Sequence, residues 1–394
     1  MEKITGAEAL MRSLEHEGVE VLFGYPGGAI MPTYDALYDH KQTLNHILVR
    51  HEQAAVHAAQ GYARVSGKVG CCIVTSGPGA MNTITGVADA MVDSTPLVVI
   101  CGQVGAAMLG TDAFQEVDVV GVTQPITKWN FQIRRAEDIA WAVARAFYIA
   151  NSGRPGPVVL DFTKNAQTAL IDYQPQKVDF IRSYNPVPQP AEGAIEKAAR
   201  MINESVKPFM LVGQGVELAD ASEELKTLIE KAQIPVGTTF LGLSALPSEH
   251  PLNMGKLGMH GNLAPNVMTN QCDLLIAVGM RFDDRVTGNL KNYAKQAKII
   301  HFEIDPSEIN KNVKVDLAVL GDCKQTLAAV TPLVDKATHN AWIDGFKPYN
   351  EKEYNKVIRP ALSPTEGPIL MGEVVNKVSA VSYTHLTLPT ICSV

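Results

Sequence analysis

Hydrophobic and polar positions in the first part of the chain alternate between short apolar runs and longer segments with helical spacing. The apolar runs at 19–25 and 69–75 are each followed, after a glycine-bearing turn, by a segment with apolar residues at helical spacing. The run at 45–50 leads directly into another such segment, 53–66. Strand-length apolar runs followed by helices predict parallel βαβ units with helices on both faces of the sheet. The first 170 residues are therefore predicted to form a doubly wound α/β domain.

Glycines stand where these predicted strands end. They are Gly24, Gly27, Gly28, Gly77, Gly79, Gly102 and Gly105. Ligands of open parallel sheets bind beyond the carboxyl ends of the strands. The loops GYPGG and TSGPG are therefore predicted to border a ligand site.

The same alternation returns after a proline-rich stretch, YNPVPQPAEG, which can continue neither a helix nor a central strand. It predicts a second doubly wound parallel-sheet domain, followed by a polar helix over 338–358. The pattern breaks again after 381, and the last residues are predicted to be a non-native tail, with a natural terminal strand as the alternative. The predicted order is a first domain at 1–170, a linker at 171–193, a second domain at 194–337, a helix and linker at 338–366, a further segment at 367–381 and the tail at 382–394.

Composition excludes several classes of protein. The 394 residues are 46% hydrophobic and 19% charged, which is ordinary for a globular chain and not for a disordered one. The net charge of −7 with scattered Lys and Arg gives no footprint for nucleic acid, and no apolar run approaches the ~18 residues of a membrane span. The six cysteines lack metal-ligand spacing, so no metal site is predicted within the chain. Buried free cysteines and a start without a signal peptide predict a cytoplasmic protein that binds small molecules.

One acid stands in an unusual place. Glu52 follows a predicted strand and begins a helix of small residues, close to the glycine-rich loops. An acid here can simply complement the helix dipole. A carboxyl group facing a glycine-lined cleft can instead serve acid–base chemistry or hold a ligand by hydrogen bonds. The residues alone leave both interpretations open.

Several motifs together carry a resemblance to a known family. They are FGYPGGAIMPTYDALYD, HEQAAVHAAQGYARVSGK, TSGPGAMNTITGVADAMVDSTPLVVICGQV, GTDAFQEVD, SGRPGPVVLDFTK, GMHG and RFDDRVTG. From residue 3 to about 380 the chain resembles the large, catalytic subunit of acetolactate synthases, also called acetohydroxyacid synthases. TSGPGAMN occurs widely among thiamine diphosphate enzymes, whereas GTDAFQE together with RFDDRVTG is much more specific.

The resemblance implies that residues 1–170 bind the pyrimidine half of thiamine diphosphate. Glu52 would hydrogen-bond the pyrimidine ring as a catalytic residue, and Gln115 would face the reacting centre. The remaining implied contacts of this cofactor are Tyr25, Gly27, Gly28, Ala29, Thr75, Pro78, Gly79 and Asn82. Phe114 and Lys164 would line the substrate channel. Turn chemistry, packing and solvated charge are the alternative explanations for these residues.

The resemblance also implies that residues 194–337 bind FAD, which the family needs for assembly although its reaction has no net redox step. The implied FAD contacts are Arg154, Gly213, Gln214, Gly215, Thr239, Leu241, Met259, His260, Gly279, Arg281, Asp283, Arg285, Glu303, Ile304 and Asp322. Asp283 next to Arg285 could equally be a structural ion pair.

The implied activity is decarboxylation of pyruvate and condensation of the two-carbon unit with pyruvate or 2-oxobutyrate, in branched-chain amino acid biosynthesis. The implied partners are further copies of the chain, as a homodimer or higher homo-oligomer, and a regulatory small subunit. Family members have a third, diphosphate-binding domain with the Mg²⁺ ligands, so 367–381 is predicted to be its first helix and the chain to be inactive by itself. The alternatives are a pyruvate oxidase-type flavin enzyme and a non-catalytic FAD-binding scaffold.

Overall fold

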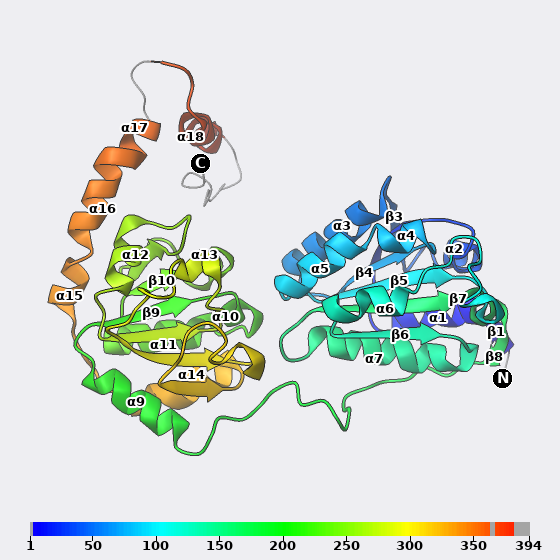
Figure 1. Cartoon of the computed structure of the whole chain (residues 1–394), viewed down its shortest axis with the longest axis horizontal. Helices are drawn as coiled ribbons and strands as arrows, with labels where there is room; N and C mark the ends of the chain where they lie inside the picture. The colour runs from blue at the N-terminus through cyan, green and yellow to red at the C-terminus, as the bar shows by residue number, and fades with distance from the viewer. Residues whose placement is uncertain (1–2, 363–366, 382–394) are drawn as a thin grey trace. The chain divides into compact units, whose positions relative to one another are not determined.

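The computed structural model describes residues 3–362 and 367–381, so the predicted tail at 382–394 lies outside the described residues. The chain divides into two compact units, Met1–Pro186 and Val187–Val394 (Figure 1). We call them the first and second domains. The division falls within the segment predicted as the linker. Residues before it pack on the first domain, where Ile181 is buried in the core.

The first domain is built on a six-stranded sheet in the order β3-β2-β4-β5-β7-β6, with every neighbouring pair parallel. Its strands are β2 (Val21–Tyr25), β3 (Asn45–Leu48), β4 (Gly70–Val74), β5 (Leu97–Gln103), β6 (Trp129–Ile133) and β7 (Pro157–Thr163). A small antiparallel pair joins β1 (Lys3–Thr5) to β8 (Leu170–Asp172). Every residue of β4, β5 and β7 is buried, as expected for a parallel sheet that is covered on both faces.

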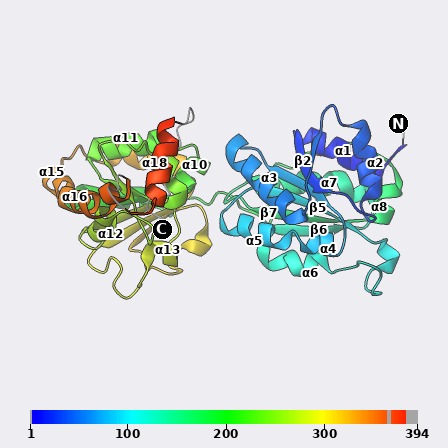
Figure 2. The same ribbon diagram turned by 90° about the horizontal axis from the view of Figure 1, so that it is seen from above.

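Helices cover both faces of this sheet (Figure 2). They are α1 (Gly6–His16), α2 (Met31–Asp39), α3 (Glu52–Ser66), α4 (Pro78–Met81), α5 (Ile84–Val92), α6 (Val119–Thr123), α7 (Ile139–Asn151) and α8 (Lys164–Thr168). One hydrophobic core lies beneath α1 and α7, and the other lies beneath α3 and α5. The α/β prediction for this domain is confirmed.

The second domain has its own six-stranded parallel sheet, in the order β11-β10-β9-β12-β13-β14. Its strands are β9 (Pro208–Val212), β10 (Val236–Thr238), β11 (Asn253–Lys256), β12 (Leu274–Val278), β13 (Lys298–Glu303) and β14 (Leu317–Leu320). Its helices are α9 (Ala194–Glu204), α10 (Gly215–Leu218), α11 (Ser222–Ala232), α12 (Leu263–Thr269), α13 (Asp284–Thr287) and α14 (Cys323–Val330). The doubly wound prediction is confirmed here too, with cores on both faces of the sheet.

The chain beyond the second sheet is not the single helix predicted over 338–358. It forms α15 (Asn340–Asp344), α16 (Lys347–Glu353), a π-helical turn η7 (Tyr354–Ile358), α17 (Arg359–Leu362) and α18 (Met371–Val381). The break follows from packing, because Trp342 Nε1 donates a hydrogen bond to Pro208 O at 2.8 Å and Phe346 is fully buried against Phe209. These anchors tie the segment to β9, and Pro348 restarts the helix in the first turn of α16.

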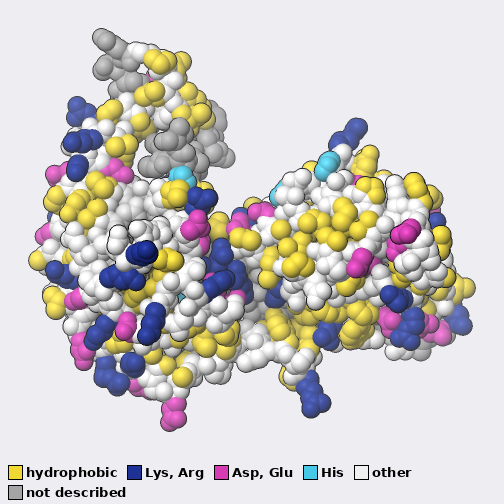
Figure 3. Space-filling view, viewed as in Figure 1, with side chains coloured by type: hydrophobic (Ala, Val, Ile, Leu, Met, Phe, Trp, Pro, Cys, Tyr) yellow, Lys and Arg dark blue, Asp and Glu magenta, His cyan; other side chains and the backbone are white. Residues whose placement is uncertain are grey.

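Short 3₁₀ turns complete the described structure. They are η1 (Ala106–Met108), η2 (Gln124–Ile126), η3 (Ala136–Asp138), η4 (Phe240–Ala245), η5 (Pro306–Glu308) and η6 (Thr331–Leu333). On the face seen in Figure 3, Lys and Arg side chains stand among Asp and Glu side chains on both domains. This distribution agrees with the scattered basic residues of the sequence.

His40, at the C-terminal end of α2, contacts two glutamates of α1, and these contacts predict a pH-dependent stability. His40 Nδ1 lies 2.8 Å from Glu15 Oε1, and its Nε2 lies 3.0 Å from Glu8 Oε2. Burial alone would lower the pKa of His40, but its hydrogen bonds to Glu15 and Glu8 outweigh burial and raise the pKa above its ordinary 6.5. The same contacts outweigh burial at Glu8 and Glu15 and lower the pKa of each carboxyl below 4.5.

The stabilisation from His40 is therefore complete below pH 6.5 and is lost as the pH rises through the raised pKa of the folded protein. The contribution of the two carboxylates is present above pH 4.5 and is lost as the pH falls through their lowered pKa values. We expect His40→Gln to cost about 1 kcal/mol near pH 6 and much less at pH 9. Urea unfolding at the two pH values measures the difference, and an equal cost at both would contradict the assignment.

Candidate functional site

The loops after β2 and β4 meet the start of α3 at the carboxyl edge of the first sheet. A Cβ added to Gly27 would lie 2.6 Å from the Thr75 side chain. One added to Gly79 would lie 2.7 Å from Thr75 Cγ2 and 3.3 Å from Glu52 Oε1. Contacts under 3.0 Å leave no room for a side chain. The structure thus brings Gly27, Thr75, Gly79 and Glu52 together, and only glycine fits at the two crowded positions.

Glu52 is held by a neighbour and does not cap its own helix. The N-cap of α3 is His51, whose Nδ1 accepts a hydrogen bond from Gln53 N at 3.2 Å. Glu52 is the first residue of α3 and is only 7% exposed, and Asn82 Nδ2 donates to its Oε2 at 2.8 Å. Oε1 points toward Gly79. A buried carboxyl with one oxygen fixed and the other facing a glycine is suited to bind a ligand.

Thr75 supplies a second polar group at this place. Its Oγ1 is buried, and no hydrogen-bond partner for it occurs among the described residues. A buried hydroxyl that makes no hydrogen bond is costly, so such a group in a native fold calls for an explanation. A ligand that exchanges a hydrogen bond with Thr75 Oγ1 would supply one.

The structure also brings Gln115 to the loop after β4. Gln115 has a φ of +57° and Gly77 one of +55°. A Cβ on Gly77 would lie 2.6 Å from Gln115 O, so the two backbones are in close contact. Phe114, beside Gln115, is 85% exposed.

The other predicted residues of this domain lie at the same sheet edge without a described contact to Glu52. Tyr25 ends β2 and is exposed, and Gly28 has open space around it. Ala29 O accepts a hydrogen bond from Gln167 Nε2 at 2.8 Å. Pro78 begins α4 and Lys164 begins α8, directly after β7, and both are exposed.

The glycines predicted for the second domain form a tight contact at the carboxyl ends of β9 and β12. A Cβ on Gly213 would lie 2.4 Å from Gly279 O, and one on Gly215 would lie 2.6 Å from Gly279 Cα. Gly279 itself has a φ of +55°. The absence of side chains lets the two strand ends pack closely at the sheet edge where parallel α/β domains bind dinucleotides.

The remaining predicted residues of the second domain also follow strands of this sheet. After β9 comes Gln214, between the two glycines, and after β10 come Thr239 and Leu241. β11 is followed by Met259 and His260, and β12 by Arg281, Asp283 and Arg285. β13 ends at Glu303 and is followed by Ile304, and β14 is followed by Asp322. Because parallel strands end at one edge of the sheet, these residues line a single edge.

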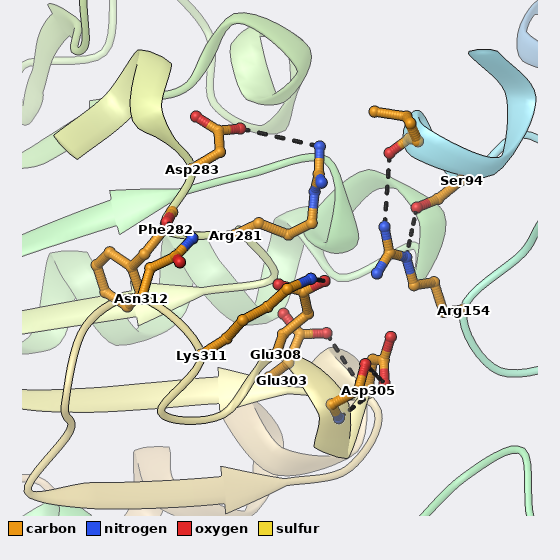
Figure 4. Close-up of polar contacts among 12 residues, drawn as sticks. Ser94, Arg154, Arg281, Phe282, Asp283, Glu303, Asp305, Glu308, Lys311 and Asn312 are labelled. Carbon is orange, nitrogen blue, oxygen red and sulfur yellow. Dashed lines mark hydrogen bonds and ion pairs between the residues drawn. The ribbon is translucent and has the colours of Figure 1, made fainter. Parts of the chain in front are cut away.

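The charged groups at this edge make contacts within the domain (Figure 4). Arg281 Nη2 lies 3.8 Å from Asp283 Oδ2. The suggested ion pair between Asp283 and Arg285 is not the one formed, because the nearest carboxylate to Arg285 is that of Asp284, at 3.7 Å. Glu303 Oε1 accepts hydrogen bonds from Ile304 N at 2.9 Å and from Asp305 N at 3.1 Å.

Two acids at this edge also hold helix ends. Asp283 Oδ1 accepts from Val286 N at 3.1 Å, and Asp322 Oδ1 accepts from Gln325 N at 3.1 Å. Both are therefore N-caps, which is a sufficient structural reason for an acid at each position. Their predicted ligand contacts stay predictions.

Arg154, predicted to contact the same ligand, belongs to the first domain. Its Nε donates to Ser94 Oγ at 2.8 Å (Figure 4). The contact ties the turn after α7 to the end of α5. Its predicted ligand contact is not tested by the structure of either domain.

One buried polar group was not singled out from the sequence. Asp161, in β7, is fully buried and accepts hydrogen bonds from the side chains of Gln103 and Gln132. The sequence contains the feature that could have identified Asp161, because this acid interrupts the apolar run PVVLDF. A charged residue in a central strand needs partners, and only the sheet order shows that two glutamines supply them.

Metal-ligand clusters and membrane-spanning helices are both absent from the described residues. Within 3–362 and 367–381, no group of three or more His, Cys, Asp or Glu residues could hold a metal ion. In the same part of the chain, no helix combines the length and the apolar character that crossing a bilayer requires.

Comparison with known proteins agrees with the two-domain division. Residues 4–122 match the family described as "Thiamine pyrophosphate enzyme, N-terminal TPP binding domain", and residues 195–330 match "Thiamine pyrophosphate enzyme, central domain". The "Probable acetolactate synthase large subunit" of Methanocaldococcus jannaschii is 51% identical over 326 residues, which are 82% of this chain and 55% of the relative.

Other relatives carry similar names. The "Acetolactate synthase large subunit" of Corynebacterium glutamicum is 49% identical over 352 residues, or 88% of this chain and 56% of the relative. That of Buchnera aphidicola is 45% identical over 366 residues, or 90% of this chain and 64% of the relative. The chain spans somewhat over half the length of these curated relatives.

Proposed function

We propose, because this chain belongs to the thiamine pyrophosphate enzyme family, that it is part of an acetolactate synthase large subunit. The proposed reaction removes carbon dioxide from pyruvate and joins the remaining two-carbon unit to a second 2-oxoacid. The relatives at 45 to 51% identity support this reaction for the protein. Their alignments cover 82% or more of this chain.

The observation that carries the proposal is the position of Glu52. Its buried carboxyl is oriented by Asn82, while Oε1 faces Gly79, which has no side chain. Thiamine diphosphate supplies an electron sink for decarboxylation when it is bound. Glu52 would exchange a proton with the pyrimidine ring at Oε1, Asn82 would keep the carboxyl in place, and burial would exclude water.

The residues present fit the pyrimidine half of this cofactor. The loops after β2 and β4 carry glycines beside Glu52 and Thr75, and the buried Thr75 Oγ1 makes no hydrogen bond with any described residue. Tyr25, Gly28, Ala29 and Pro78 would complete the wall of the pocket.

Replacing Thr75 tests this fit. Thr75→Val keeps the shape of the side chain and removes a hydroxyl that makes no hydrogen bond in the described structure. We therefore expect the free energy of unfolding without cofactor to stay the same or to rise by up to about 1 kcal/mol, since a buried unsatisfied polar group is costly. We expect the affinity for thiamine diphosphate to fall roughly five- to tenfold, as for one lost hydrogen bond.

Isothermal titration of the full-length protein with thiamine diphosphate and Mg²⁺ measures the affinity. Thr127→Val, elsewhere in the same domain, is the matched control, because Thr127 Oγ1 already donates to Thr123 O at 2.8 Å. Unchanged affinity in the Thr75 variant would contradict the contact.

We also propose that the second domain binds FAD. The supporting observation is that Gly213, Gly215 and Gly279 cluster at the carboxyl ends of β9 and β12, where parallel α/β domains bind a pyrophosphate. Arg281 and Arg285 would neutralise the pyrophosphate. Glu303 would bind ribose hydroxyls once its Oε1 no longer accepts hydrogen bonds from the backbone N–H groups of Ile304 and Asp305. Mg²⁺ would accompany thiamine diphosphate as its counter-ion.

Further proposals follow from the same family membership. The protein would accept 2-oxobutyrate as well as pyruvate as the second substrate, and Phe114 and Lys164 would line the channel through which substrates enter. It would form homo-oligomers, bind a regulatory small subunit and be located in the cytoplasm. Whether the 394-residue chain is inactive by itself stays a prediction. Assaying that purified chain with pyruvate, thiamine diphosphate, Mg²⁺ and FAD tests it.

Complementation tests the proposed function as a whole. The gene for the full-length protein should restore growth without valine and isoleucine to a bacterial strain that lacks acetolactate synthase. Failure to restore growth, with folded protein present in the cells, would contradict the proposal.

A further inference from the structure

The buried carboxyl of Asp161 has no part in the proposed chemistry, yet it occupies the centre of a polar cluster. In the sheet register it pairs with Cys101 of β5 and with Gln132 of β6. Asp161 Oδ2 accepts hydrogen bonds from Gln132 Nε2 at 2.7 Å and from Gln103 Nε2 at 3.2 Å. Its Oδ1 is buried without a hydrogen-bond partner among the described residues.

Gln103 connects this carboxyl to the loop after β5. Besides the bond to Asp161, its Nε2 donates to Val117 O at 2.9 Å, and its Oε1 accepts from Val104 N at 2.9 Å. Val104 begins the loop that leads to α6, and Val117 lies near its end. A single fully buried glutamine therefore holds both ends of loop 104–118.

The same loop presents two residues of the proposed active site. Phe114 is exposed, and Gln115 contacts Gly77 in the loop that precedes Gly79. The chain of contacts runs from Asp161 through Gln103 to both ends of the loop, and from Gln115 to Gly77 in the loop after β4.

We infer that Asp161 is a positioning residue that, through Gln103, fixes loop 104–118 and so sets the place of Gln115 against Gly77. The relevance to catalysis rests on the proposed function, whereas the effect on the loop does not. Bonds to a charged acceptor are roughly twice as strong as bonds between neutral groups, so the ionised carboxylate holds the loop more firmly than a neutral group.

The electrostatic surroundings support this role. Burial raises the pKa of Asp161 to about 6, against the opposing hydrogen bonds from Gln132 and Gln103. The charge of Asp118 before α6 also raises it, and that of Arg134 after β6 lowers it. The neighbouring thiol of Cys101 has its own pKa raised well above 9.0, so it stays neutral.

A raised carboxyl pKa means that the folded state binds the proton more tightly than the unfolded state. The free energy of unfolding therefore falls as the pH rises from 3.8 to about 6, and above that pH the buried carboxylate charge destabilises the folded state. If Asp161 contributed only to stability, a neutral isostere such as Asn would serve better at this position. If Asp161 is a positioning residue, Asn would not replace it, because the loop would be held less firmly.

Hydrogen exchange of the full-length protein, measured by mass spectrometry at pH 7.5, separates the two roles. In Asp161→Asn we expect the amides of loop 104–118 to exchange roughly five- to tenfold faster, with the melting temperature unchanged or raised. The matched control is Asp172→Asn, at an exposed position on β8, which should leave the loop unchanged. Unchanged exchange of the loop, or faster exchange across the whole first domain, would overturn the proposal.

Two additional measurements sharpen the test. After correction for intrinsic rates, the difference between wild type and Asp161→Asn should vanish below pH 5, where Asp161 is neutral. A second variant, Gln103→Leu, should loosen the loop by itself, and adding Asp161→Asn to it should cause little further change, because both act through one contact. Additive effects would show that Asp161 does not act through Gln103. Since exchange is read without substrate, a failed acetolactate assay leaves this result standing, and the reverse also holds.

Discussion

Full-length protein carrying Glu52→Gln is expected to form acetolactate roughly 10²- to 10⁴-fold more slowly than wild type, the range typical for loss of a general acid–base group. The amide has the shape of the carboxyl and can still accept the hydrogen bond from Asn82 Nδ2, which measures 2.8 Å in the native protein. It cannot exchange a proton with the cofactor. The melting temperature should therefore change little while kcat collapses, and a coupled or colorimetric acetolactate assay measures this.

The matched control is Glu223→Gln. Glu223 also lies in the first turn of a helix, α11, but is exposed on the other domain. If Glu52 served only the helix dipole, both variants would lose a few tenths of a kcal/mol of stability and neither would lose activity. Near-normal acetolactate formation by Glu52→Gln would show that Glu52 is not a catalytic residue.

Gly279→Ala is expected to remove flavin binding and to destabilise the second domain by roughly 3 kcal/mol, the sum of a left-handed backbone cost and overpacking. The new methyl group would lie 2.7 Å from Gly215 Cα and 3.0 Å from Val216 N. These are backbone atoms that cannot turn away, so β9 and β12 must separate where the pyrophosphate would bind. Absorbance of the purified protein near 450 nm and its denaturant unfolding curve measure the two effects.

Gly288→Ala is the control, because Gly288 has the same φ of +55° as Gly279 but no atom within 4 Å of an added Cβ. It carries the backbone cost without the crowding. We expect this variant to keep its flavin and to lose only ~1–2 kcal/mol. Equal behaviour of the two variants would mean that the glycine contact has no part in binding.

Most of the fold followed from the periodicity of the sequence, because fully buried strands such as β4, β5 and β7 leave continuous apolar runs. The exceptions have physical reasons. β6 lies at the edge of its sheet and carries polar residues, so Trp129–Ile133 gives no clear run. The break of the helix predicted over 338–358 depends on Trp342 and Phe346, whose partners Pro208 and Phe209 lie more than 130 positions earlier.

The candidate site was predictable only in part. Glycine-rich turns at strand ends indicated where a ligand would bind, the residue pattern singled out Glu52, and the resemblance gave that residue a role. None of these showed that Asn82 holds one carboxyl oxygen. The vacant hydroxyl of Thr75 and the close contact between Gly77 and Gln115 arise from the folding of separate loops onto each other. Such contacts leave no periodic signal, and the same holds for the bridge from Asp161 to loop 104–118.

Product analysis of the full-length wild-type protein tests the central claim most directly. The protein is incubated with ¹³C-labelled pyruvate, thiamine diphosphate, Mg²⁺ and FAD, while NMR follows the products and absorbance follows the flavin. We predict acetolactate and carbon dioxide, no reaction without thiamine diphosphate, and an unchanged flavin spectrum. Bleaching of the flavin during turnover, with acetate or acetyl phosphate and no acetolactate, would contradict the proposed function and favour a pyruvate oxidase.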